Sequence, residues 1–229
     1  MVAIYPLDDQ RVDVEKITKR LGSTVRVEIS PLTEGGSRRT LRFFVHSETW
    51  VRVPIGGFMQ VNHAVNRASV AHVIDHTIAS ESASALDLDC GAGNYSLSRV
   101  AMRLNWYGVE IDPAAISVDR GAAAAKGLEG LEVSVGDAAS AAKRLLDEER
   151  SFDVVVANPP RAGLRASAAG VARLADWAIV LCSCDTKAFA RDLAVLTRDA
   201  WTVQSVTVFD ILPHTRHVEW RAWLTPSQP

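Results

Sequence analysis

Short apolar runs alternate with alanine-rich helical stretches along the chain from Phe58 onward. Apolar runs of this kind, bounded by turn residues, predict buried strands. The predicted strands are Ala85–Leu88, Trp106–Ile111, Leu131–Val135, Phe152–Ala157, Ala178–Ser183, Val203–Phe209 and Val218–Leu224. Between them the pattern predicts helices that include Pro113–Lys126, with proline at its start, and Thr186–Thr197. Repeated strand–helix–strand units predict a parallel sheet with helices on both faces.

The two ends of this alternating region differ from its middle. Asn62 can cap a helix in which Val70, Ile74 and Ile78 recur at helical spacing. At the other end, the segment Asp210–His217 that joins the last two predicted strands is too short for a helical crossover. We therefore expect those two strands to pair antiparallel.

The residues before Phe58 follow a different pattern. Val12–Leu21 can form a short helix, and Thr24–Ile29 and Thr40–His46 alternate as strands do, with a turn at Glu34–Ser37 between them. We expect a small β-rich appendage over residues 1–57 and a main α/β domain over residues 58–229.

Composition restricts the classes of protein to which the chain can belong. Its 229 residues (24.8 kDa) are 48% hydrophobic and 23% charged, which excludes a disordered chain and fits one globular domain with a small appendage. No stretch approaches the ~18 apolar residues of a membrane span, and Met1–Gln10 lacks a signal pattern. Three cysteines are too few for a disulfide framework, so we expect a reducing, cytoplasmic location. Because the net charge is -2, nucleic acid must contact a local patch rather than bulk positive charge.

A glycine-rich turn follows the first predicted strand of the main region, within Leu86–Tyr95. Gly91 and Gly93 let the backbone adopt positive φ and approach a ligand closely. Ligands of open α/β sheets bind at the carboxyl ends of strands, where this turn lies. The third glycine of a dinucleotide fingerprint is absent, which favours a single adenosine moiety over a dinucleotide.

Acidic residues stand in or just after three successive strands, at Asp87, Glu110 and Asp137. The Glu110 carboxylate can accept hydrogen bonds from both hydroxyls of a ribose, and Asp137 can hold an adenine amino group. The alternative interpretation is that these acids end their strands and bind nothing.

Two further strand ends carry chemistry. Asn158-Pro159-Pro160-Arg161 follows the fourth strand, where the prolines stiffen the backbone and the Asn158 amide can both donate and accept. Cys184 follows the fifth strand and precedes a predicted helix, whose positive N-terminus lowers the pKa of a thiol. Cys184 is therefore a candidate nucleophile, although a free cysteine can equally serve core packing.

The segment between the last two strands contains His214 and His217 and is followed by Glu219. Glu219 can enter the same cleft as a general base. The two histidines have no obvious third ligand in the sequence, so we expect no metal site.

The glycine-rich block resembles the class I S-adenosylmethionine-dependent methyltransferases. Several separated segments, in family order between Phe58 and Leu224, then resemble the RNA uracil-C5 methyltransferase family, and the last of them is the most specific. They are GFMQVN (57–62), LDLDCGAGNYSL (86–97), NPPRAGL (158–164), SC (183–184) with ARDL (190–193), and PHTRHVE (213–219).

This resemblance implies a Rossmann-like α/β fold with a seven-stranded, mostly parallel sheet whose last strand is antiparallel. It implies that the Cys184 thiolate adds to carbon 6 of uracil in tRNA or rRNA, that carbon 5 takes a methyl group from S-adenosylmethionine, and that Glu219 then removes the carbon 5 proton. The implied cofactor contacts are Gln60, Asp87, Asp89, Gly91, Gly93, Asn94, Glu110, Asp137 and Asn158. The implied substrate contacts are Phe58, Asn158 and Arg161.

The chain departs from the family pattern at specific places. Asn158 stands where members commonly carry Asp, Asp185-Thr186 replaces the common Asn-Pro after the nucleophile, and the segment before Phe58 is too short for the usual oligonucleotide-binding barrel with a central domain. Other readings therefore stay open: a methyltransferase for a free nucleoside or small pyrimidine, one for an exocyclic amine, or a non-catalytic homologue that binds cofactor or RNA.

Overall fold

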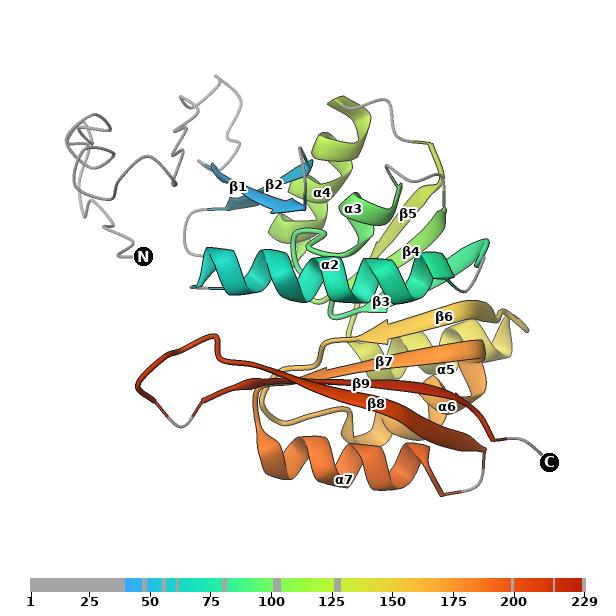
Figure 1. Cartoon of the computed structure of the whole chain (residues 1–229). Coiled ribbons are helices and arrows are strands. Elements are labelled where there is room, and N and C mark those ends of the chain that lie inside the picture. Colours follow the sequence, from blue (N-terminus) through green and yellow to red (C-terminus); the bar gives the residue numbers. More distant parts are fainter. Residues whose placement is uncertain are drawn as a thin grey trace.

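A seven-stranded sheet forms the centre of the molecule in a computed structural model (Figure 1), with strand order β5-β4-β3-β6-β7-β9-β8. The structure describes residues 40–46, 49–54, 57–60, 62–79, 82–100, 104–125, 129–198, 200–215 and 217–227. The strands of this sheet are β3 (Ser84–Leu88), β4 (Asn105–Glu110), β5 (Leu131–Val135), β6 (Phe152–Ala157), β7 (Ala175–Ser183), β8 (Trp201–Phe209) and β9 (Glu219–Pro226). The pairings from β5 to β7 are parallel, and β9 runs antiparallel to β7 and to β8.

Helices cover both faces of this sheet (Figure 1). One face carries α2 (His63–Ala79), α3 (Ser96–Val100) and α4 (Pro113–Ala125). The other face carries α5 (Ala138–Asp147), the short 3-10 helix η1 (Arg165–Ser167), α6 (Ala168–Leu174) and α7 (Thr186–Leu196). Within the described ranges, none of the helices is long and apolar enough to span a membrane.

The central strands are apolar on both faces because each face packs against helices. Val154 and Val156 of β6 point into one buried cluster with Val70 of α2. Val155, between them, points into the opposite cluster with Leu145 of α5. The alternation of side chains along a strand thus feeds two cores from one apolar run.

The predicted fold class is confirmed, and each of the seven predicted strands forms with boundaries shifted by at most three residues. The last two strands pair antiparallel, as their short connection predicts. The largest shift is at β7, which begins at Ala175 rather than Ala178, because the exposed Asp176 interrupts the apolar run near its start. Asn62 does cap α2, since its Oδ1 accepts a hydrogen bond from the Val65 amide at 3.2 Å.

A separate two-stranded sheet precedes the main one. It pairs β1 (Thr40–His46) antiparallel with β2 (Thr49–Pro54). The strand at Thr40–His46 is confirmed, whereas β2 was not predicted. Val51 and Val53 of β2 are buried in the same cluster as α2. The predicted helix 12–21, strand 24–29 and turn 34–37 lie outside the described residues, and the division of the chain at residue 57 stays a prediction.

The topology gathers loops at one edge of the sheet. Parallel strands β3, β4, β6 and β7 all end at that edge. Because β9 runs the opposite way, it begins there, and Ser183 at the end of β7 pairs with Trp220 near the start of β9. Residues that follow β7 and residues that open β9 are therefore neighbours.

Candidate active site

A cavity of about 610 Å³ opens at this carboxyl edge. Segments from distant parts of the sequence line it: the residues after β2, the turn after β3, the ends of β4, β6 and β7, and the start of β9. The residues predicted from sequence that line it are Phe58, Gln60, Asp89, Gly91, Asn94, Glu110, Asn158, Arg161, Cys184 and Glu219. The structure therefore brings both candidate catalytic groups and most of the candidate cofactor contacts into one space.

The glycine-rich turn is held by Glu110. Its Oε2 accepts a hydrogen bond from the Gly91 amide at 2.9 Å, and its Oε1 accepts one from the Asp112 amide at 2.9 Å. Gly91 has φ +59°, and a Cβ at that position would meet no atom within 4 Å, so the space in front of it is open. The carboxylate and the bare backbone together form a wall that a ligand can approach closely.

Asp89 stands in this turn with a positive φ of 59°. Burial, followed by the nearby carboxylates of Glu110 and Asp137, raises its pKa from the ordinary 3.8 to about 6. Negative charge is thus concentrated at this end of the cavity. A ligand with a positive charge or with hydroxyl donors relieves that repulsion.

Three of the predicted cofactor contacts do not line the cavity. Asp87 is fully buried in β3. Gly93 adopts φ +80° and donates its amide to the Cys90 carbonyl at 3.1 Å. Asp137 caps α5, since its Oδ1 accepts a hydrogen bond from the Ser140 amide at 3.0 Å, and that bond lowers the pKa of Asp137. Their contact with a cofactor stays a prediction.

Asn94 is fixed by a residue that the sequence did not single out. Asn94 and Asn66 of α2 exchange two amide hydrogen bonds, of 3.0 and 3.2 Å. Asn66 is fully buried. A polar residue on the buried face of a helix was the available signal, because buried amides need partners.

Cys184 and Glu219 face the same cavity from neighbouring strands. Burial and then the Glu219 charge raise the pKa of the half-buried Cys184 thiol, while the guanidinium of Arg161 acts in the opposite direction. Asp185, the next residue, caps α7 by accepting a hydrogen bond from the Ala188 amide at 2.8 Å. That bond lowers the pKa of Asp185 itself.

Glu219 is only 5% exposed and is held from two sides. Its Oε2 accepts a hydrogen bond from Arg221 Nη1 at 3.0 Å, and its Oε1 accepts one from Gln60 Nε2 at 3.4 Å. The sequence reading missed Arg221. Its signal was a charged residue inside an apolar strand, two positions after Glu219 and therefore on the same face.

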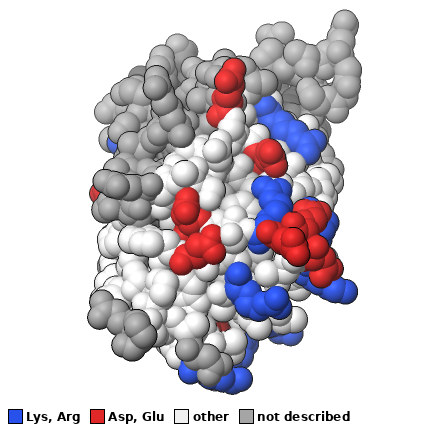
Figure 2. Space-filling view, turned by 90° about the vertical axis from the view of Figure 1, so that its right-hand side faces the viewer, with Lys and Arg blue, Asp and Glu red and all other residues white. Residues whose placement is uncertain are grey.

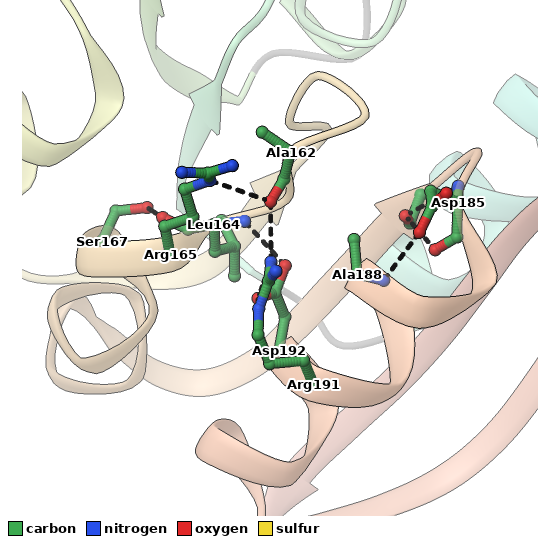
Figure 3. A network of polar contacts seen from close by, with 9 residues as sticks. Ala162, Leu164, Arg165, Ser167, Asp185, Ala188, Arg191 and Asp192 are labelled. Carbon is green, nitrogen blue, oxygen red and sulfur yellow. Dashed lines mark hydrogen bonds and ion pairs between the residues drawn. The ribbon is translucent and has the colours of Figure 1, made fainter.

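The loop that carries Asn158 and Arg161 is fastened to α7 by a polar clamp (Figure 3), formed by Ala162, Leu164, Arg191 and Asp192. Asp192 is buried, and its Oδ2 accepts the Leu164 amide at 2.6 Å. Arg191 pairs with Asp192 at 2.8 Å and donates to the Ala162 carbonyl at 2.7 Å.

This clamp links two walls of the cavity, because α7 follows directly after Cys184 and the clamped loop follows β6. Gly163 makes the fit possible. It has φ +75°, and a Cβ there would collide with Asp192 Oδ2 and Arg191 Nη2.

Comparison with known proteins gives concordant matches. The family model described as tRNA (uracil-5-)-methyltransferase matches residues 7–227. The 23S rRNA (uracil(1939)-C(5))-methyltransferase of Shewanella sp. strain MR-7 is 34% identical over 164 residues, which cover 72% of this chain and 36% of that protein. The enzyme of the same name from Shewanella sediminis is 28% identical over 215 residues, which cover 90% of this chain and 48% of that one. The chain thus spans about a third to a half of the length of these relatives.

Solved structures share the fold. The tRNA (uracil-54, C5)-methyltransferase of Pyrococcus abyssi, in complex with S-adenosyl-L-homocysteine, superposes with a TM-score of 0.66 at 24% identity, over 81% of this chain and 44% of that one. The N-methyltransferase NodS of Bradyrhizobium japonicum superposes with a TM-score of 0.59 at 13% identity, over 74% of this chain and all of that one.

Replacing Asp89 by Asn tests the repulsion in the glycine-rich turn. The raised pKa means that the folded chain binds the proton more tightly than the unfolded chain, so the penalty is absent below pH 3.8 and complete above about pH 6. We expect Asp89→Asn to raise the free energy of unfolding of the unliganded chain by about 2 kcal/mol at pH 7.5, with the gain vanishing toward pH 4. Urea unfolding across this pH range measures it. Asp176→Asn, at an exposed site of β7, serves as the control and should show no such trend.

Alkylation of Cys184 by iodoacetamide reports the charges around its thiol. Glu219→Gln removes a negative neighbour and should lower the pH midpoint of alkylation by about half to one unit. Arg161→Gln removes the positive neighbour and should raise the midpoint by a similar amount. Mass spectrometry identifies the labelled residue. Shifts of the same sign in both variants would show that the two charges do not act on the thiol as described.

Gly163→Ala tests the clamp. The added methyl group meets Asp192 and Arg191 in a backbone conformation that disfavours alanine, so we expect a loss of more than about 1 kcal/mol in the free energy of unfolding. Gly121→Ala is the matched control. Gly121 is an exposed residue of α4 whose Cβ would meet open space, so the same substitution should stabilise the chain by about 1 kcal/mol.

Proposed function

Because the chain belongs to the tRNA (uracil-5-)-methyltransferase family, we propose that it transfers a methyl group from S-adenosylmethionine to carbon 5 of a uracil in RNA. The observation that carries this proposal is the meeting of Cys184 and Glu219 in a cavity that also contains the glycine-rich turn. This reaction requires a nucleophile, a carboxylate base and a place for the methyl donor, and one cavity contains a candidate for each.

The turn after β3 supports the cofactor assignment. When bound, S-adenosylmethionine supplies an electrophilic methyl group on a positively charged sulfur. Asp89 and Glu110 provide negative charge at the wall where we propose that it binds. Gly91 leaves the space beside them open, and Asn94 is held in a fixed orientation by Asn66. These residues bind and orient the donor in the proposal.

Uracil carbon 5 is a weak nucleophile, and the proposal assigns its activation to Cys184. The thiolate adds to carbon 6, which makes carbon 5 electron-rich and able to attack the methyl group. Glu219 then accepts the proton from carbon 5, the carbon 5–carbon 6 double bond re-forms, and the thiolate leaves. Since burial raises the pKa of the thiol, the positive charge of Arg161 has a definite part, which is to favour the thiolate.

Base recognition is assigned to the rim of the cavity. Phe58 is 77% exposed and lines the opening, where an aromatic ring can stack on a base taken out of its strand. Asn158 lies on the wall beside Arg161. Its amide can accept from uracil N3–H through oxygen and donate to a carbonyl through nitrogen.

Contact with RNA phosphates is assigned to the same side. Arg161 is exposed and lines the cavity, and Arg165 is exposed at the start of η1, just after the clamped loop. The opposite end of the molecule, shown in Figure 2, displays acidic and basic side chains interspersed rather than a basic face. The arginines near the cavity are therefore better candidates for phosphate contacts than the charged residues at the opposite end.

Transfer of a labelled methyl group to bulk tRNA, rRNA and free nucleosides tests the proposal. The wild-type chain should label uracil at carbon 5 and form a covalent adduct with RNA that contains 5-fluorouridine. Cys184→Ala should abolish both while still binding S-adenosylmethionine by calorimetry. Glu219→Gln should form the adduct but release product at least about a hundredfold more slowly, because proton removal is lost.

Cys182→Ala is the matched control, since it removes a neighbouring thiol that does not line the cavity, and it should retain transfer. Labelling of a nitrogen atom, or full activity in Cys184→Ala, would contradict the proposed chemistry. Labelling of free uridine without RNA would instead identify a small pyrimidine as the substrate.

A further inference from the structure

A guanidinium is buried inside the main sheet. Arg221 lies in β9, between β7 and β8, and is only 1% exposed. Removing a cation from water costs several kcal/mol unless ionic and hydrogen-bonding partners offset it. The burial of an arginine in this strand therefore needs a structural or functional explanation.

The partners of Arg221 connect two parts of the proposed active site. Nη1 donates to Glu219 Oε2 at 3.0 Å and to the Trp220 carbonyl at 2.9 Å. Nη2 donates to the hydroxyl oxygen of Tyr95 at 2.9 Å. Tyr95 is buried directly after Asn94, at the end of the glycine-rich turn. One rigid guanidinium thus spans from the carboxylate to that turn.

We propose that Arg221 is a positioning residue and the countercharge of Glu219, which holds Glu219 Oε2 inside the sheet and so presents Oε1 to the cavity beside the methyl-donor site. This inference rests on the proposed function in one respect only, which is the role of Glu219 as the base. The hold of Arg221 on Glu219 is a property of the folded chain itself.

Charge balance around Glu219 supports this role. Among the described residues, the titratable groups that act on Glu219 from other elements are Cys182 of β7, Cys184 just after β7, and Tyr95. Burial raises the pKa of each, to about 11 for Cys182, so these groups are mostly neutral near pH 7. His72 of α2 acts on Arg221, and burial lowers its pKa, so it also adds little charge. Arg221 is then the main countercharge for Glu219.

Without that countercharge, burial would favour the protonated carboxyl. A protonated carboxyl cannot accept the carbon 5 proton. Removal of Arg221 is therefore expected to weaken Glu219 as a base.

The test compares Arg221→Met with Arg221→Lys in the full chain, using two readouts. The first is the pH dependence of kcat/KM for methyl transfer. In Arg221→Met we expect the acidic limb of this pH profile to move to higher pH by about one unit or more. The value of kcat/KM should then fall at least about tenfold at pH 6.5 and partly recover at pH 8.5. In Arg221→Lys, which keeps the charge, the limb should stay near that of the wild type.

The second readout needs no activity. Carbon-13 NMR of chain labelled at its glutamate carboxyl groups, with the Glu219 signal assigned from Glu219→Gln, should show the same upward shift of the titration midpoint in Arg221→Met. If the wild type transfers no methyl group, the proposed function fails, yet this titration still decides the role of Arg221.

A third variant covers the case in which Arg221→Met does not fold. Tyr95→Phe removes one partner of Arg221 but keeps the ion pair with Glu219. It should leave the acid limb and the carboxyl titration in place and lower kcat severalfold through looser positioning. The inference would be overturned if the Glu219 titration midpoint in Arg221→Met lay within about 0.3 pH unit of the wild-type value. If Arg221→Met does not fold, a shifted Glu219 titration in Tyr95→Phe would overturn it.

Discussion

The antiparallel insertion of β9 between β7 and β8 is the constraint on which the rest of the site depends. Because β9 reverses direction, its first residue, Glu219, stands where β7 ends, and the register that pairs Ser183 with Trp220 brings Cys184 beside it. A parallel strand in the same place would carry that carboxylate to the far end of the sheet. The thiol, the carboxylate and the glycine-rich turn share one cavity for this topological reason.

The charged groups in and around that cavity come from separate elements of the fold. Acidic groups of the turn, Asp89 and Glu110, concentrate negative charge where a cationic donor is proposed to bind. Arg161 favours the thiolate at the mouth, and Arg221 supports the carboxylate from within the sheet. Glu110 is fixed by two backbone amides and Glu219 by the buried Arg221, so this part of the site is preorganised by the fold.

The sequence was sufficient for the elements whose signals are local. Apolar runs gave the seven strands of the sheet, and the cap at Asn62 gave the start of α2. The strand at Thr49–Pro54 was missed because it is short and ends in proline, although Arg52 is exposed between the buried Val51 and Val53. Most of the candidate site residues in recognisable segments line the cavity. Arg221 and Asn66 were missed, since Tyr95 and Asn94, which they contact, lie far away in the chain and only the folded structure brings them together.

The clamp between Asp192 and the loop after β6 has a consequence for how such a protein can diverge. Helix α7 emerges directly from Cys184, and Asp192 within it holds the loop that presents Asn158 and Arg161. The wall that is proposed to recognise a base and the thiol that is proposed to attack it are therefore joined through hydrogen bonds. Because no residue of α7 lines the cavity, substitutions on this helix would act on the proposed selectivity from a distance, and natural variation should be sought along α7 as well as in the cavity lining.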